Sequence, residues 1–196
     1  SGYGRTGPYA DKGGFDLVAQ GMSGLMSITG ESEDKPPMKV GAPITDITAG
    51  LLAASGILAA LVHREKTGEG QKVDTSLYEA GIVHTYWQSA IAGATGKSPG
   101  PLGSAHPLTA PYQAFKTKDK WITVGASNQN TWLMLLKAIG REDLQKNEKF
   151  SSNLNRKQNL KELVDILNKE LIKKTSSEWL KIFDDNGLPC GPINSI

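Results

Sequence analysis

Hydrophobic residues recur at helical intervals in several stretches of the chain. Apolar side chains at 15, 18, 22, 25 and 26 predict a helix over 15–28, and a longer apolar helix is expected from Asp46 to about Lys66. Farther along, a helix is expected over 130–139, before Gly140. Apolar residues at 160, 163, 164, 167 and 171 predict an amphipathic helix. Most of the chain is therefore expected to be helical.

Strands are predicted at three places. Residues 112–115 and 121–125 flank a polar turn, which is typical of a hairpin. Residues 71–75 predict a short strand between two helices of the first half. Because helix, strand, helix is the pattern of α/β folds, we expect the first half to be α/β and the second half to be a small α+β domain.

Helix ends carry clear local signals. Ser76 and Glu79 have the spacing of a capping box, which starts a helix expected to run toward Ile91. Thr175 and Glu178 form a second capping box, whose helix is expected to close at 186–187, an Asn-Gly pair. Basic residues over 63–66, followed by Gly68, mark the end of the long apolar helix and are interpreted as solvated structure.

The longest apolar run covers 51–62. It is interrupted by Ser55 and Gly56 and is too short to span a bilayer, so it predicts a buried helix and no membrane segment. The chain opens without a basic and apolar leader, so no signal peptide is predicted. Because it also opens without Met and inside a Gly-rich turn, we expect it to be part of a longer protein.

Composition excludes several classes of protein. The chain has 196 residues, of which 38% are hydrophobic and 21% charged, and this balance is typical of a folded globular protein. Its 22 basic and 20 acidic residues supply no dense positive field, which argues against nucleic-acid binding. A single cysteine, Cys190, excludes a disulfide scaffold and fits a reducing, intracellular compartment. Trp121, Trp132 and Cys190 are expected in the core.

Composition also changes along the chain. Residues 1–112 hold 18 of the 22 glycines and carry a net charge of −2, whereas 113–196 carry +4. The change lies beside 96–111, a stretch rich in Gly, Pro and Ser. We interpret 96–111 as a connector or functional loop between a first unit, 1–95, and a second unit, 112–196.

Most short motifs are weak. Gly2, Gly4 and Gly7 match G-x-G-x-x-G, but no strand precedes them and a proline follows at once, so a turn is favoured over a dinucleotide site. The three histidines are scattered and predict no metal site. No G-x-S-x-G is present, which argues against a serine hydrolase.

Asp46 has two interpretations. It precedes a long helix, so it can be a capping residue whose carboxylate accepts backbone N–H groups. Alternatively, it is a carboxylate held at the positive end of a helix, where negative charge is favoured, and surrounded by glycine and alanine that admit a bulky substrate. Such a carboxylate can attack an activated acyl group and form a covalent intermediate.

Several segments together resemble the family III CoA-transferases. The segment from Asp46 to Gln71 is the most specific, and 103–107 with 111–119 is most similar to the succinyl-CoA:glutarate CoA-transferase branch. The resemblance extends over nearly the whole chain, and the other segments that carry it are 2–4, 7–9, 14–16, 20–30 and 189–192. It implies an α/β fold in which part of a Rossmann-like, CoA-binding large domain precedes a small α+β domain. It also implies an interlocked homodimer of longer chains.

The resemblance further implies that Asp46 is the nucleophile. Its carboxylate would attack an acyl-CoA, forming a mixed anhydride, and would then carry CoA as an aspartyl thioester until an acceptor carboxylate takes it over. The expected substrates are succinyl-CoA and a small carboxylic acid such as glutarate, without a metal. Each step builds an oxyanion that needs preorganised N–H donors.

Other site residues follow from the same matched segments. A CoA-contacting segment and a loop over the acyl group are implied, with Lys12 as a phosphate partner, Phe15 beside the thioester and His106 near the acyl carboxylate. The CoA-contacting residues are Lys12, Gly13, Gly14, Phe15 and Asp16, and the substrate-binding residues are Gly103, Ser104, Ala105 and His106.

Two alternatives remain beside the transferase. Related α-methylacyl-CoA racemases place a catalytic histidine in the segment matching 14–16, and Phe15 cannot move a proton, which disfavours that reaction. The other is a module that binds CoA without catalysis. The compartment is expected to be the mitochondrial matrix in a eukaryote or the cytoplasm in a bacterium.

Overall fold

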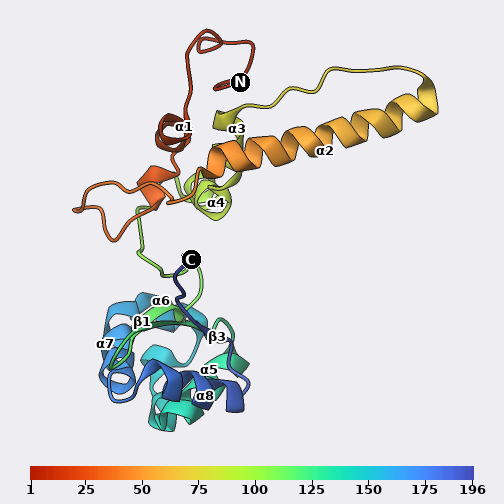
Figure 1. The fold of residues 1–196 in the computed structure, drawn as a ribbon. Helices are drawn as coiled ribbons and strands as arrows, with labels where there is room; N and C mark the ends of the chain where they lie inside the picture. The colour runs from red at the N-terminus through yellow and green to blue at the C-terminus, as the bar shows by residue number, and fades with distance from the viewer. The chain divides into compact units, whose positions relative to one another are not determined.

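The chain folds into two compact units. The computed structural model describes residues 1–196, and the units cover Ser1–Gly103 and Ser104–Ile196 (Figure 1). The boundary between them falls inside the expected connector, 96–111.

The first unit contains helices and no strand. Its elements are α1 (Asp16–Met22), the short 3-10 helix η1 (Met26–Ile28), α2 (Ile44–Thr67), α3 (Leu77–Val83) and α4 (Tyr86–Thr95). The helix predicted over 15–28 is interrupted, because Gly24 adopts a left-handed conformation with φ +85°. The helix that starts after Ser76 is likewise divided, at His84 and Thr85.

The strand predicted over 71–75 is wrong. These residues form no regular structure, because no neighbouring strand pairs with them and a strand requires a partner for its backbone groups. The first unit by itself is therefore helical and not α/β. The mixed α/β character of the chain comes from the sheet of the second unit.

Helix α2 begins and ends close to where the sequence predicts. It has 24 residues and ends at Gly68, whose φ of +77° is the left-handed cap and whose N–H donates to the Arg64 carbonyl. The return segment after α2 lies against it at Gly56, where an added Cβ would come within 2.7 Å of Val73 Cγ1. A side chain at position 56 would therefore displace this segment.

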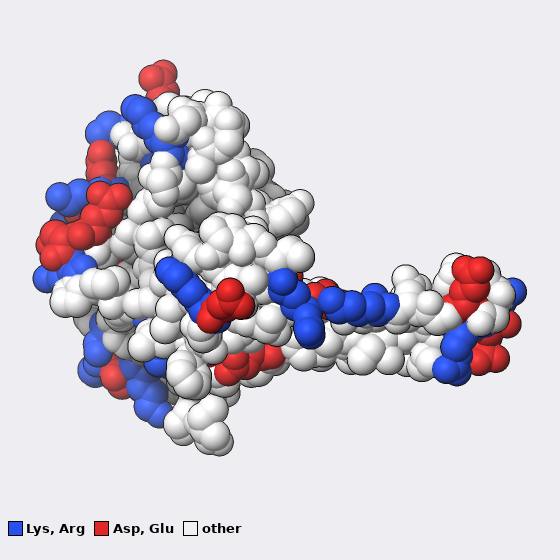
Figure 2. Space-filling view, turned by 90° about the horizontal axis from the view of Figure 1, so that it is seen from above, with Lys and Arg blue, Asp and Glu red and all other residues white.

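The prediction that this helix is buried is wrong within this chain. Helices α1 and α3 and the return segment are the main parts of the chain that pack on α2, and they cover a small part of it. In Figure 2 it extends away from the rest of its unit, with charged side chains gathered at the far end. The exposed apolar side chains of α2 are Ile47, Leu51, Leu52, Ile57, Leu58, Leu61 and Val62.

The whole of helix α2 is longer than the apolar run 51–62, which is too short to span a bilayer. By length and composition alone the 24-residue helix is long and apolar enough to cross a membrane, although little of it is buried in this structure. The core helix of a soluble protein can meet the same criteria.

The second unit contains a three-stranded antiparallel sheet. Strands β1 (Tyr112–Lys116) and β2 (Trp121–Gly125) form the predicted hairpin, with Tyr112 opposite Gly125. Strand β3 (Cys190–Pro192) pairs with the other edge of β2 and was not predicted. The remaining elements are α5 (Gln129–Ile139), η2 (Glu142–Lys146), η3 (Glu148–Phe150), α6 (Asn153–Gln158), α7 (Leu160–Leu171) and α8 (Ser176–Asp185).

The hydrophobic core lies in the second unit. The predicted leucine row of α7 is buried at Leu163, Leu167 and Leu171, and both members of the Thr175–Glu178 capping box make their hydrogen bonds. Trp132 is fully buried as expected, but Trp121 is half exposed because it lies on the outer face of β2. The small α+β domain predicted for this half therefore has a core of its own.

Candidate functional site

Asp46 lies in the first turn of α2. Pro43 occupies the N-cap position and makes no side-chain capping bond, so this turn begins without a cap from its own segment. Thr45 is fully buried, whereas the Asp46 side chain is exposed. The first turn of α2 therefore presents one carboxylate to solvent at the end of the helix where the dipole favours negative charge.

Asp16 of α1 supplies the missing cap. Its Oδ1 accepts the backbone N–H of Thr45 at 3.0 Å and the Thr45 hydroxyl at 2.8 Å. Its Oδ2 accepts the side-chain amide of Gln20 at 2.8 Å, and Gln20 in turn accepts the N–H of Val40. Burial raises the pKa of Asp16, but the hydrogen bonds from Thr45 and Gln20, helped by the charge of Lys39, outweigh it and lower the pKa below its usual value.

Helix α3 packs tightly against the same turn. A Cβ added at Gly81 would meet Ser23 and would lie 3.4 Å from Thr45 Cγ2. One turn farther along α2, the Thr48 hydroxyl lies 2.7 Å from Nε2 of His84. The start of α2 is therefore held from two sides, by α1 and by α3.

The predicted CoA-contacting segment leads into α1. Phe15 occupies the N-cap position of α1 and is 81% exposed, an unusual setting for a large aromatic ring. Gly14 has no room for a side chain, because a Cβ would come within 2.8 Å of Gly2 Cα. Gly13 is exposed, and the ammonium of Lys12 lies 4.1 Å from the centre of the Tyr9 ring.

The predicted substrate-binding loop is held by backbone and side-chain bonds. Gly103, with φ +59°, donates its N–H to the Gly30 carbonyl within the first unit. In the second unit, Ser104 Oγ accepts the N–H of Ala114, and the N–H of His106 donates to the Tyr112 carbonyl. The short segment 104–106 therefore runs along the edge of β1.

Helix α6 holds the next part of this loop. Asn153 accepts the N–H of Ala110 and donates to the Leu108 carbonyl. The fully buried Arg156 donates from Nε to the Ala110 carbonyl at 2.7 Å, and Lys157 donates to the His106 carbonyl at 2.9 Å. Three side chains of one short helix thus bind the loop.

His106 has a defined orientation in this loop. Its Nδ1 accepts the N–H groups of Leu108 and Thr109, at 3.0 and 3.2 Å, which places the ring proton of the neutral form on Nε2. Burial, and then the charge of Lys157, lower the pKa of His106 below its ordinary value. The imidazole is therefore favoured in its neutral form.

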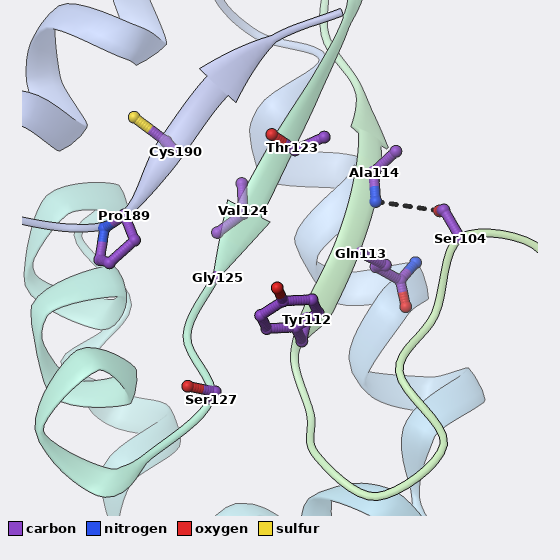
Figure 3. Close-up of a pocket in the computed structure, with 10 residues that line it drawn as sticks. All are labelled: Ser104, Tyr112, Gln113, Ala114, Thr123, Val124, Gly125, Ser127, Pro189 and Cys190. Atoms are coloured by element: carbon purple, nitrogen blue, oxygen red, sulfur yellow. Dashed lines mark hydrogen bonds between the residues drawn. The ribbon is translucent and has the colours of Figure 1, made fainter. Parts of the chain in front are cut away.

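A groove lies on the sheet beside Ser104. It has a volume of about 570 Å³ (Figure 3). Small residues at 114 and 125 leave space there, and the groove contains no charged side chain. Its lining residues are Ser104, Tyr112, Gln113, Ala114, Thr123, Val124, Gly125, Ser127, Pro189 and Cys190.

Cys190 lines the groove, but its thiol is not activated as a nucleophile. Its side chain is only partly buried, and burial together with the nearby Asp184 raises the pKa of the thiol to about 11. The structure places no group of three or more His, Cys, Asp or Glu residues for a metal ion.

The structure distributes the predicted site residues over both units. Residues 12–16 and Asp46 belong to the first unit, and Asp16 is joined to the start of α2 through Thr45. Ser104, Ala105 and His106 belong to the second unit. Sequence reasoning missed Thr45, Gln20 and Asn153, because their hydrogen bonds join residues 20 to 43 positions apart and leave no local signal.

Comparisons with known proteins agree over the full chain. The family model described as CoA-transferase family III matches residues 1–196. The chain is 39% identical over 201 residues to an acyl-CoA transferase of Fusarium pseudograminearum, covering 100% of this chain and 43% of that protein. It is 38% identical to the succinyl-CoA:glutarate CoA-transferase of Mus musculus, covering 100% of this chain and 45% of that protein.

A solved structure gives the same result. The crystal structure of a CAIB/BAIF family protein from Brucella suis matches with a TM-score of 0.81 and 35% identity, over 100% of this chain and 51% of that one. The chain therefore spans about half the length of the relatives that it matches.

Proposed function

This chain belongs to CoA-transferase family III, and from that membership we propose that it carries the nucleophilic aspartate, Asp46, of an enzyme that moves CoA between carboxylic acids. The observation that carries the proposal is the exposed carboxylate in the first turn of α2, inside the segment that most resembles the family. The neighbouring Asp16 has its oxygens engaged by Thr45 and Gln20 and is not available for this role.

The reaction is an exchange of one thioester for another. The Asp46 carboxylate attacks the acyl carbonyl of the donor, and the C–S bond breaks to give a mixed anhydride and the CoA thiolate. The thiolate then attacks the aspartyl carbonyl of the anhydride, which releases the donor acid and leaves CoA on Asp46 as a thioester. Two electrons move with each bond and no proton is consumed.

The second half of the exchange reverses these steps. The acceptor carboxylate attacks the aspartyl thioester and expels the thiolate, giving a second anhydride. Attack of the thiolate on the acceptor acyl carbon forms the new acyl-CoA and restores the Asp46 carboxylate. The free energy of the thioester is conserved throughout, so the exchange needs no ATP.

Residues of the predicted CoA segment suit the carrier. The exposed ring of Phe15 offers an apolar surface to the pantetheine end, and the solvent-facing Lys12 and Gly13 can approach a phosphate. His106, with its ring proton on Nε2, supplies an N–H donor suited to an acyl oxygen. Succinyl-CoA and glutarate are the proposed substrate pair, by similarity to the mouse relative.

The test is to trap the activated carboxyl of the aspartate, which is present in both the anhydride and the thioester. The intact protein, incubated with succinyl-CoA and hydroxylamine, is expected to gain a hydroxamate at Asp46 that peptide mass spectrometry locates. Asp46→Ala should abolish both trapping and transfer to glutarate, whereas Asp34→Ala, a matched change at an exposed aspartate, should leave both unchanged. Transfer that persists in Asp46→Ala would overturn the assignment, and CoA binding without trapping would favour a binding module.

A further inference from the structure

The start of α2 depends on a carboxylate from another helix. The first four N–H groups of a helix lack partners within it, and a side chain at the N-cap normally accepts one of them. Pro43 occupies that position in α2 and provides no acceptor. Asp16, 29 positions earlier in the chain, accepts the N–H of Thr45 in its place.

The hydrogen bonds around Asp16 form a connected, partly buried network. Thr45 and Gln20 are both fully buried, and each is bonded to a different oxygen of the Asp16 carboxylate. Gln20 also accepts the N–H of Val40, so the network binds the segment 40–45 at its first residue, Val40, and at its last, Thr45. Buried polar networks of this kind, with each group bonded, hold their backbone in one conformation.

Helix α3 approaches Thr45 at Gly81. A Cβ added at Gly81 would lie 3.4 Å from Thr45 Cγ2, an ordinary contact distance, so α3 covers the buried side chain of Thr45. Thr45 is thus held by its hydrogen bonds to Asp16 and covered by α3. The next residue is the exposed Asp46, so a displacement of Thr45 would be passed directly to it.

We propose that Asp16 is a positioning residue, which fixes the first turn of α2 through Thr45 and thereby the direction in which the Asp46 carboxylate points. This inference rests on the proposed function of Asp46, and it gives Asp16 a role other than contact with CoA. The two carboxylates have different roles: Asp16 accepts three hydrogen bonds and holds the backbone, whereas Asp46 is exposed and reacts.

The experiment compares four variants of the intact protein in the transfer assay. Asp16→Ala removes the cap, and Thr45→Val removes the hydroxyl bond while keeping the shape of the side chain. Thr45→Ser keeps the hydroxyl and is expected to rescue activity. Asp11→Ala is the matched control, because Asp11 is an exposed aspartate five residues before Asp16.

The inference predicts that kcat falls in these variants while KM hardly changes. A misdirected nucleophile lowers kcat and the rate of hydroxamate trapping, by about 10- to 100-fold for Asp16→Ala and less for Thr45→Val, while KM for the acyl-CoA stays nearly unchanged. The kcat of Thr45→Ser and Asp11→Ala should remain close to that of the unmodified protein.

Three results would overturn it. A raised KM with unchanged kcat would show that Asp16 contacts CoA. A lowered melting temperature with unchanged kcat per folded molecule would show a role in stability alone. If Asp16→Ala does not fold, an unchanged kcat in Thr45→Val would have the same force. Failure of the proposed function is detected separately, because it would appear as activity in Asp46→Ala.

Discussion

At the scale of single residues, hydrogen-bond partners decide what each polar group can do. His106 illustrates this, since two backbone N–H groups occupy its Nδ1 and a lysine holds its carbonyl. A proton on Nδ1 would have to displace both donors, and the positive charge of Lys157 opposes a second positive charge nearby. The surroundings of His106 therefore favour a neutral N–H donor over an imidazolium.

The contribution of Lys157 can be measured directly. Lys157→Met removes a positive charge that lowers the pKa of His106, so that pKa should rise toward its ordinary value. It should stay below that value, because burial, the larger cause, is unchanged. The measurement is an NMR titration of the His106 ring, assigned with His106→Gln. Lys161→Met, at an exposed position of α7, is the control, and a pKa that falls or stays fixed in Lys157→Met would contradict the assigned cause.

Residue-level prediction from the sequence succeeds where the signal is local. The Ser76 and Thr175 capping bonds were predicted because each joins residues three positions apart. The bond from Asp16 to Thr45 spans 29 positions, and nothing beside Asp16 announces its partner. The sequence therefore predicts Asp16 as a site residue but does not reveal that its carboxylate oxygens accept hydrogen bonds from within the fold.

At the scale of elements, helices were easier to predict than their surroundings. The ends of α2 and α5 follow from caps such as Gly68 and Gly140, both left-handed. The strand β3 contains glycine and proline and exists only because β2 offers an unpaired edge, so no local pattern marks it. The predicted burial of α2 was wrong for a similar reason. Whether a helix is buried depends on the residues that cover it, and the sequence of the helix does not specify these.

Two glycines of α2 allow a matched test of its packing. In Gly50→Ala the new methyl meets no atom within 4 Å, so better helix propensity should raise the free energy of unfolding by about 1 kcal/mol. In Gly56→Ala the methyl would lie 2.7 Å from Val73 Cγ1, and Val73 is a stiff, branched side chain. This variant should therefore gain less than Gly50→Ala or be destabilised, as measured by urea unfolding of the intact protein.

A double variant tests whether contact with Val73 is what limits the stability of Gly56→Ala. Val73→Ala removes the branched methyl groups, so adding Gly56→Ala to it should recover the gain in helix propensity that the single change lacks. Equal effects of Gly56→Ala with and without Val73→Ala would show that the return segment does not press on α2 at this point.

At the scale of the whole molecule, the two units differ in how much apolar surface they bury. The buried hydrophobic residues of the first unit are Ala19, Leu25, Ala49 and Ala80, of which one is large. The second unit holds the entire main cluster, including Trp132, Phe150 and Phe183. Since buried apolar area is the dominant stabilising contribution, the second unit has much more of it to offset the loss of conformational entropy.

This contrast predicts that the second unit folds on its own and that the first unit does not. Residues 104–196, expressed alone, should unfold in one cooperative transition with an enthalpy of about 65 kcal/mol near 60 °C, at about 0.7 kcal/mol per residue. Residues 1–103 alone should show no such transition, because α2 leaves its apolar side chains exposed. Scanning calorimetry and amide hydrogen exchange of both pieces measure this.

A variant in the core tests whether buried apolar area stabilises the second unit. Leu167 is fully buried in α7, and Leu167→Ala should destabilise residues 104–196 by about 2 to 5 kcal/mol through lost burial and a residual cavity. Leu154→Ala, at a position that is 65% exposed on α6, should have little effect. A cooperative transition in residues 1–103 alone would contradict the argument, because those residues would then be stable without covering the apolar face of α2.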